Sequence, residues 1–291
     1  MFLEQVVNGI FLGSMYALVA IAFTLIMGIF GMLNIAVGEV FMLGAFFGMS
    51  LIMAGVPFHF ALPLAMIGSG VVSLVIERLS FRPLRHAPLL VPLLSTIGFS
   101  ILLQNLANIV WGTERLEFPG VAALPDLKLG SMVIPSVQFL VLGSAVALIL
   151  ALDLFIQRTR VGRGMRAVAE NLETSSILGV EPNGIILVTF FVSGLLAGAS
   201  GVFFGLTFSL IAPTIGLEVG LKGIAAMVVG GLGNMRGGII GGLLIGITET
   251  LSVAYISASY RDVFVYSLLF LALIIRPEGI LGTVQQEKGR A

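Results

Sequence analysis

The chain has 291 residues, of which 58% are hydrophobic and only 10% are charged. Because soluble domains carry roughly 25% charged residues, this composition is typical of a protein that crosses a membrane several times. Lysine and arginine balance aspartate and glutamate at 15 each, so the overall charge does not favour nucleic-acid binding. The lack of cysteine excludes disulfides, iron–sulfur clusters and thiol catalysis.

Charged residues are rare in hydrocarbon, so the intervals between them predict where the chain crosses the bilayer. The apolar run after Glu4 has no basic start and no small-residue cleavage site, which indicates a first span rather than a removable signal. The predicted spans, in chain order, are 6–30, 36–54, 61–79, 91–111, 136–155, 184–206, 238–254 and 263–275. A ninth apolar stretch, 216–234, is short and interrupted by glycines, which indicates a broken or re-entrant helix. The sequence therefore predicts an all-α polytopic transmembrane bundle of eight or nine spans, forming one domain over 1–291.

The loops between the predicted spans differ in charge. With nine crossings, the basic elements share one side: the loops 78–85 and 158–166, Arg236, and a tail that carries Arg276, Lys288 and Arg290. The acidic segment 112–135 then lies on the opposite side. Because basic loops remain in the cytoplasm, this arrangement predicts an external N-terminus and a cytoplasmic C-terminus. If 216–234 does not cross the membrane, the number of crossings becomes even and this assignment of sides no longer holds.

The longest strongly charged segment is 158–182, which lies between two apolar runs and holds four arginines and three glutamates. Helical spacing places an apolar stripe on one face, made of Met165, Val168, Ala169 and Leu172. Gly179 stands where a helix ends in a left-handed conformation, and Pro182 suits the start of the next span. The pattern predicts a short amphipathic helix on the cytoplasmic face, to which a soluble partner docks. An ordinary basic loop is the alternative.

Small residues gather in the predicted span 184–206. Gly194, Gly198 and Gly201 fall on nearly one face of this helix. Glycines allow two helix backbones to approach closely in a membrane, so we expect this face to pack tightly inside the bundle.

Three ionisable residues stand inside apolar sequence. Glu39 either faces the translocation path, near a break made by Asn34 and Gly38, or stabilises the N-terminus of the second span. Glu249 either faces the path or hydrogen-bonds a neighbouring helix. Lys222 stands four residues after Glu218, a spacing that favours a structural ion pair between them near the outer face over a substrate contact.

Other constellations that would carry chemistry are not apparent. The glycine-rich stretch 230–242 lacks the Gly-Lys-Ser/Thr ending of a nucleotide-binding loop. No nucleophile–base set, catalytic carboxylate pair or metal-ligand spacing appears. The sequence predicts no catalytic residue, no metal site and no cofactor.

Several segments resemble permeases of the branched-chain amino acid ABC-transporter family. Residues 160–171, followed by 175–180, are similar to the family's cytoplasmic coupling segment, and 31–39, 230–242 and 275–282 are similar to further family segments. The spacing of Glu173 and Gly179 fits the importer coupling motif, although Thr174 and Ser175 replace the expected alanines. Val37 and Arg236 also depart from the family pattern, where histidine and proline are common.

The resemblance implies a permease subunit of an ABC importer for branched-chain amino acids, in a bacterial-type cytoplasmic (inner) membrane. The expected partners are two ATP-binding cassette subunits that hydrolyse ATP, a second homologous permease chain or a second copy of this one, and an extracytoplasmic substrate-binding protein. The residues expected to couple to the ATPases are Arg163, Arg166, Glu170, Leu172, Glu173 and Gly179. The candidates for the translocation path are Asn34, Gly38, Glu39, Asn234 and Glu249. Alternative functions are import of other amino acids, urea or amides, ion-coupled secondary transport, and intramembrane catalysis, for which the chain offers no reactive set.

Overall fold

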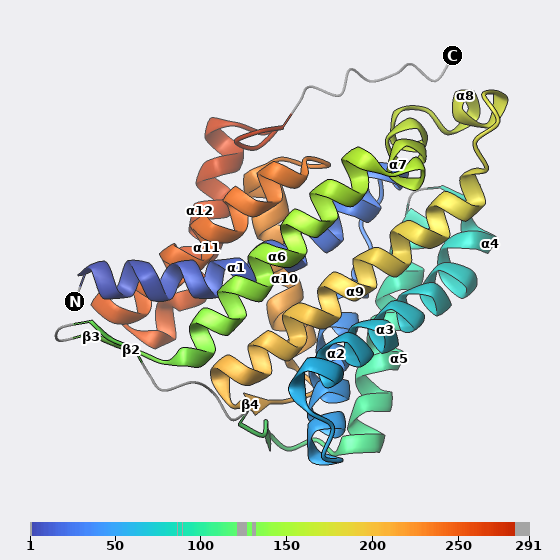
Figure 1. Cartoon of the computed structure of the whole chain (residues 1–291). Coiled ribbons are helices and arrows are strands. Elements are labelled where there is room, and N and C mark those ends of the chain that lie inside the picture. The colour runs from blue at the N-terminus through green and yellow to red at the C-terminus, as the bar shows by residue number, and fades with distance from the viewer. Residues whose placement is uncertain (1, 86, 89, 121–126, 130–131, 283–291) are drawn as a thin grey trace.

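The computed structural model describes residues 2–85, 87–88, 90–120, 127–129 and 132–282, with the side chains of 127–129, 132–134 and Glu173 left aside. Lys288 and Arg290 of the predicted basic tail lie outside the described residues. The described chain is a bundle of long helices that run side by side, with short elements gathered at its two ends (Figure 1).

Seven helices in the described part are long and apolar enough to cross a membrane. The long helices of the bundle are α1 (Phe2–Phe30), α3 (Phe58–Ile76), α5 (Leu90–Trp111), α6 (Ser136–Arg158), α9 (Pro182–Phe208), α11 (Met235–Tyr255) and α12 (Arg261–Ile275, preceded by the 3-10 turn η2, Ala258–Tyr260). Two shorter helices complete the bundle, α2 (Val37–Met53) and α10 (Ile215–Gly230). The predicted all-α polytopic bundle is confirmed.

Helix α10 corresponds to the short glycine-interrupted stretch of the sequence. Its 16 residues are continuous rather than broken, and they are fewer than the roughly 20 that a full crossing requires. Gly223, near its middle, packs against Val19 in the middle of α1, and the turn after Gly230 reverses the chain into α11. At that turn, Gly231 has a φ of 122°, a backbone conformation that side chains disfavour.

The core of the bundle lies around α1, which packs against α9, α10 and α11. In α1, 83% of the most apolar window is buried, against 17% in α6 and 6% in α12. Helices α5, α6 and α12 therefore form the periphery. Their exposed apolar side chains suit lipid or another membrane subunit.

The glycine face predicted in α9 is a tight helix interface. A Cβ added at Gly194 would lie 2.6 Å from Cβ of Ser73 in α3, and one at Gly201 would overlap the carbonyl oxygen of Phe41 in α2. Gly198 likewise faces Ser69. The prediction of close packing is confirmed, because these glycines leave no room for a side chain.

Two local predictions are wrong. The segment 78–85 is not the basic loop that the sequence predicts, because α3 continues as a π-helical turn, η1 (Glu77–Phe81), and a short α4 (Arg82–Leu84). Buried Glu77, Ser80 and Phe81 hold this extension against the bundle. The segment 158–182 forms two helices, α7 (Arg160–Glu170) and α8 (Leu172–Ile177), rather than one.

Short strands close the end of the bundle opposite α7 and α8 (Figure 1). Strands β2 (Leu127–Leu129) and β3 (Met132–Ile134) form a hairpin. Strand β1 (Leu116–Glu117) pairs antiparallel with β4 (Leu210–Ile211), which follows α9. This pairing ties the loop after α5 to the end of α9.

Candidate functional site

The charged hairpin of α7 and α8 lies at one end of the bundle. The Thr159 hydroxyl caps α7 by accepting from Gly162 N at 2.9 Å, and the Asn171 side chain caps α8 by accepting from Thr174 N at 2.9 Å. Asn171 itself has an extended backbone (φ −159°, ψ 115°), which separates the two helices. Its capping side chain explains the break that helical periodicity alone did not reveal.

The apolar stripe of α7 packs inward. Met165 and Val168 are buried against the bundle, with Met165 beside the end of α1, whereas Ala169 is exposed. The docking stripe predicted from periodicity therefore holds the helix in place instead of facing outward. Exposed Arg163 and Glu170 lie on the outer surface, and exposed Arg166 donates to the carbonyl of Ile156 in α6.

The end of α8 presents apolar side chains to the outside. Ile177 is 86% exposed and Leu178 is 76% exposed. Gly179 follows with a φ of 83°, as predicted, and its N–H bonds the carbonyl of Ser176. Leu172 is half-buried at the start of α8, and the side chain of Glu173 lies outside the described part.

Asn34, Gly38 and Glu39 lie together where α2 begins. Glu39, in the first turn of α2, is 1% exposed, and its Oε1 accepts from the Ser100 hydroxyl of α5 at 3.0 Å. Its Oε2 faces Gly216 of α10, where an added Cβ would overlap it, and has no hydrogen-bond partner among the described residues. Glu39 thus lies in a small gap between α2, α5 and α10.

Asn234 lies away from the other path candidates, in the turn between α10 and α11. Its side-chain oxygen caps α11 by accepting from Arg236 N at 3.0 Å and Gly237 N at 3.3 Å. Its side-chain nitrogen donates to the carbonyl of Leu281 at 2.8 Å. These contacts hold the turn to the segment after α12.

Glu249 in α11 lies at the centre of a buried ion cluster. Its Oε1 accepts from Lys222 Nζ of α10 at 2.6 Å, and its Oε2 accepts from the Tyr16 hydroxyl of α1 at 2.8 Å. Lys222 also lies 3.0 Å from Asp262 at the start of α12, and Arg261 lies 4.0 Å from Glu249. The cluster joins four helices, α1, α10, α11 and α12, through charged hydrogen bonds.

The predicted ion pair between Lys222 and Glu218 is wrong. The Lys222 side chain is 5% exposed and points into the bundle, where it contacts Glu249. The Glu218 side chain, in contrast, is 58% exposed. Glu218 instead lies 3.7 Å from Arg261. The choice of partner follows from the three-dimensional packing of α10 against α11, which the spacing along one helix does not encode.

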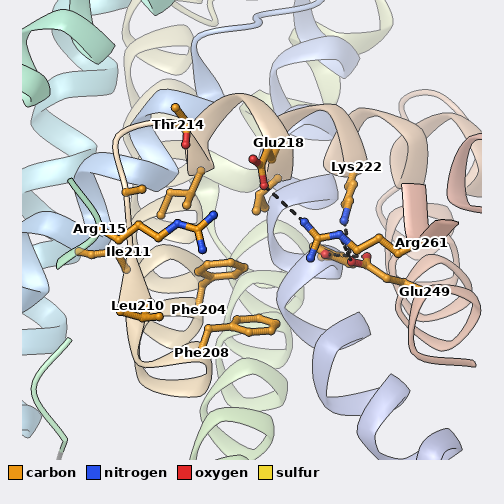
Figure 2. Close-up of a pocket in the computed structure, with 14 residues that line it drawn as sticks. Arg115, Phe204, Phe208, Leu210, Ile211, Thr214, Glu218, Lys222, Glu249 and Arg261 are labelled. Carbon is orange, nitrogen blue, oxygen red and sulfur yellow. Dashed lines mark hydrogen bonds and ion pairs between the residues drawn. The ribbon is translucent and has the colours of Figure 1, made fainter. Parts of the chain in front are cut away.

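A cavity of about 250 Å³ lies beside this cluster, between the end of α9, β4 and α10 (Figure 2). Tyr16, Lys222 and Glu249 of the cluster form part of its lining. An apolar wall comes from the end of α9 and from β4, with Phe204, Phe208, Leu210 and Ile211. Glu218, Arg261 and Arg115 add charged side chains to the lining, so the cavity combines apolar and charged walls.

Arg115 reaches the cavity because the loop that carries it is fastened to α9. Ser209, with a φ of 56°, ends α9 and turns the chain into β4. There the β1–β4 pairing and the bond from Phe118 N to the Ser209 carbonyl (3.0 Å) hold the loop. The Phe118 ring packs where Gly205 has no side chain. Sequence reasoning missed Arg115 because this loop lies far from α10 along the chain.

A second cavity of about 500 Å³ also borders the ion cluster. It is lined by residues of α1, α6, α9 and α11, including Asn8, Gln138 and Thr250. Phe208, Glu249 and Arg261 line both cavities. The ion cluster therefore borders two cavities in the same half of the bundle.

Together the long apolar helices, the charged hairpin and the cavities define an integral membrane protein of the transporter class. A family model described as "Branched-chain amino acid transport system / permease component" matches residues 5–273. The chain belongs to this family of permease components, as the resemblance of its motifs predicted.

Individual relatives agree with the family. The chain is 38% identical to the high-affinity branched-chain amino acid transport system permease protein LivH of Escherichia coli K12, over 99% of this chain and 97% of that protein. It is 38% identical to BraD, the corresponding permease protein of Pseudomonas aeruginosa, over 99% and 98%. A probable permease protein LivH of Methanocaldococcus jannaschii is 27% identical, over 94% and 91%.

One solved structure shares the fold. The structure titled PsaBC from Streptococcus pneumoniae in complex with Fab aligns with a TM-score of 0.52 over 93% of this chain and 91% of that chain. The sequence identity of 11% limits this likeness to the arrangement of helices.

Proposed function

We propose that this chain is the transmembrane permease subunit of an ABC importer that carries branched-chain or closely related amino acids into the cell. The observation that carries the proposal is the match of the permease family model over residues 5–273. Relatives that are 38% identical over nearly their whole length are named as branched-chain amino acid permease proteins, which supports the substrate class.

The chain itself supplies the path and not the energy in this proposal. Two ATP-binding cassette subunits would hydrolyse ATP, a second permease chain would complete the path, and an extracytoplasmic protein would deliver the substrate. ATP binding and hydrolysis would shift the bundle between outward- and inward-facing states, each stabilised by different contacts. Glu39, with Asn34 and Gly38, and Glu249 in the ion cluster are the proposed path or gating residues. Asn234 would act through the turn that it anchors.

The α7–α8 hairpin is the proposed contact with the ATPases. Arg163, Glu170 and the apolar tip at Ile177 and Leu178 are exposed at this end of the bundle. An exposed apolar tip flanked by charges suits a protein interface better than a solvated loop. In this orientation the hairpin and the C-terminus are cytoplasmic, and the N-terminus is outside.

Reconstituted vesicles test the function directly. The permease, its ATPases and the binding protein are incorporated into proteoliposomes, and uptake of radiolabelled leucine is measured with and without ATP. We expect uptake that requires ATP and both kinds of partner. Uptake driven by an ion gradient without ATPase subunits would instead establish a secondary transporter.

The coupling residues are tested in the same vesicles. Replacing Arg163 and Arg166 by glutamate, or Ile177 and Leu178 by aspartate, should abolish ATPase binding in a pull-down while membrane insertion persists. Glu117→Gln, an exposed change at the opposite end, is the matched control. Normal pull-down and uptake in both double variants would refute the coupling role.

A further inference from the structure

The cavity of about 250 Å³ beside the ion cluster carries two loosely held charges of opposite sign. Arg115 lines it and makes no ion pair or hydrogen bond with the described residues. Glu218 also lines it, and its nearest cation, Arg261, is 3.7 Å away and lies close to Glu249 and Asp262 as well. Figure 2 shows the Arg115 guanidinium directed into the space beside Phe204, with Glu218 and Arg261 across from it.

The other charged groups at the cavity are already engaged. Glu249 accepts from both Lys222 and Tyr16, and Lys222 also contacts Asp262. Counting the groups, Glu218, Glu249 and Asp262 give three negative charges against two positive charges from Lys222 and Arg261. The cluster therefore carries one excess negative charge, which favours a cation, and Arg115 stands apart to attract an anion.

The rest of the cavity is apolar and small. Phe204, Phe208 and Ile211 form a wall without charge. The volume of about 250 Å³ is below the range of about 300–1,000 Å³ of pockets that hold drug-sized ligands. A solute of single-amino-acid size fits, whereas a peptide, a nucleotide or an oligosaccharide does not.

We infer that this cavity is a binding subsite for an amino-acid zwitterion with an aliphatic side chain. Arg115 receives the α-carboxylate, Glu218 receives the α-ammonium, and Phe204, Phe208 and Ile211 contact the side chain. The inference rests on the proposed function and deepens it, because it places a recognition step inside the permease itself. Urea or a simple amide lacks both charges and would gain little from Arg115 and Glu218.

Direct binding to the complete transporter tests the subsite. The permease with its partner membrane and ATPase subunits is placed in nanodiscs without the binding protein, and binding of radiolabelled leucine is measured. Competition with leucinamide, which lacks the carboxylate, and with 4-methylpentanoate, which lacks the ammonium, separates the two contacts. Wild-type protein should bind leucine saturably and each analogue at least about tenfold more weakly.

Two variants make the assignment specific. Arg115→Gln should weaken leucine binding by about tenfold to a hundredfold, the loss expected for a charged hydrogen bond, and leave leucinamide binding unchanged. Glu218→Gln should weaken leucine similarly and leave 4-methylpentanoate unchanged. Glu117→Gln, on the same loop as Arg115 and absent from the cavity lining, should bind like wild type.

Three results would overturn the subsite: no saturable leucine binding to the wild-type complex, unchanged leucine binding in both variants, or an equal loss for leucine and the analogue that lacks the relevant charge. ATP-driven leucine uptake by the wild-type complex, measured in parallel, separates this outcome from failure of the proposed function. If the wild-type complex takes up leucine and both variants bind leucine as wild type does, the subsite alone is refuted. If the wild-type complex does not take up leucine, the proposed function is refuted.

Discussion

At the residue scale, the unusual feature is a cluster of full charges inside a membrane bundle. Lys222 and Glu249 are 4% and 5% exposed, and each has partners of opposite charge or a hydrogen-bond donor. A buried charge is tolerated when it is paired and hydrogen-bonded, and removing one partner leaves the other stranded. The cluster therefore holds α1, α10 and α11 together, and it offers a contact that a conformational change can break.

Lys222→Met should destabilise the protein by about 3–5 kcal/mol, because Glu249 keeps a buried charge without its closest partner. Arg261, 4.0 Å from Glu249, should offset part of the loss. The free energy of unfolding by chemical denaturation in detergent micelles measures the effect. Adding Glu249→Gln to the same chain removes the stranded charge and keeps an acceptor for Tyr16, so the double variant should recover stability. A double variant as unstable as the single one would show that pairing is not the cause.

At the element scale, glycines decide how closely the helices approach. Helix α9 meets α3 at Gly194 and α2 at Gly201, where a Cβ has no space, whereas Gly143 in α6 has nothing within 4 Å of such an atom. The same residue type thus serves tight packing in one helix and leaves open surface in another. Without a hydrophobic effect between helices in lipid, this close contact is a main source of association.

Gly194→Ala should cost about 1–3 kcal/mol, because the added methyl group overpacks the contact with Ser69 and Ser73. Gly143→Ala is the matched control and should be neutral or stabilise the protein by up to about 1 kcal/mol through helix propensity. Melting followed by fluorescence-detected size-exclusion chromatography compares the two. Equal melting temperatures for both variants would contradict the packing role.

The hairpin at the charged end makes a second prediction at this scale. Asn171→Ala removes the cap of α8 and should destabilise this short helix by about 0.5–2 kcal/mol without unfolding the bundle. Hydrogen exchange followed by mass spectrometry should show faster exchange over 172–178, and α7, which has its own cap at Thr159, serves as the internal reference. Unchanged exchange in α8 would show that the cap does not hold it.

At the scale of the whole molecule, the two ends of the bundle differ in character. One end carries the hairpin α7–α8 and the extension of α3, and the other carries the short strands (Figure 1). Strand β4 at this second end lines the cavity that holds Arg115. In the proposed orientation the first, basic end faces the cytoplasm, as basic loops of membrane proteins do, and the end with the short strands faces outward.

Single cysteines test the orientation, since the natural chain has none. Glu114→Cys and Ser176→Cys place an exposed thiol at opposite ends of the bundle. In right-side-out membrane vesicles, a membrane-impermeant maleimide should label position 114 directly and position 176 only after lysis. The reverse pattern would place the hairpin outside and exclude its contact with cytoplasmic ATPases.

The sequence by itself determined the fold class, the position of most spans and the family. Hydrophobic runs of bilayer length identify helices without reference to their neighbours, and the motifs at 160–171 and 230–242 are local. The glycine face of α9 was also readable, because helical spacing is a property of one segment. Gly179 and Pro182 marked helix boundaries correctly for the same reason.

Only the tertiary structure decided which charged residues meet. Lys222 selects Glu249 rather than Glu218 because α10 turns that side chain toward α11. Arg115 reaches the cavity because β1 pairs with β4, nearly a hundred positions away in the chain. Contacts between distant segments depend on helix rotation and depth, which hydropathy does not encode, so the ion cluster and the cavity beside it form only when the helices are packed.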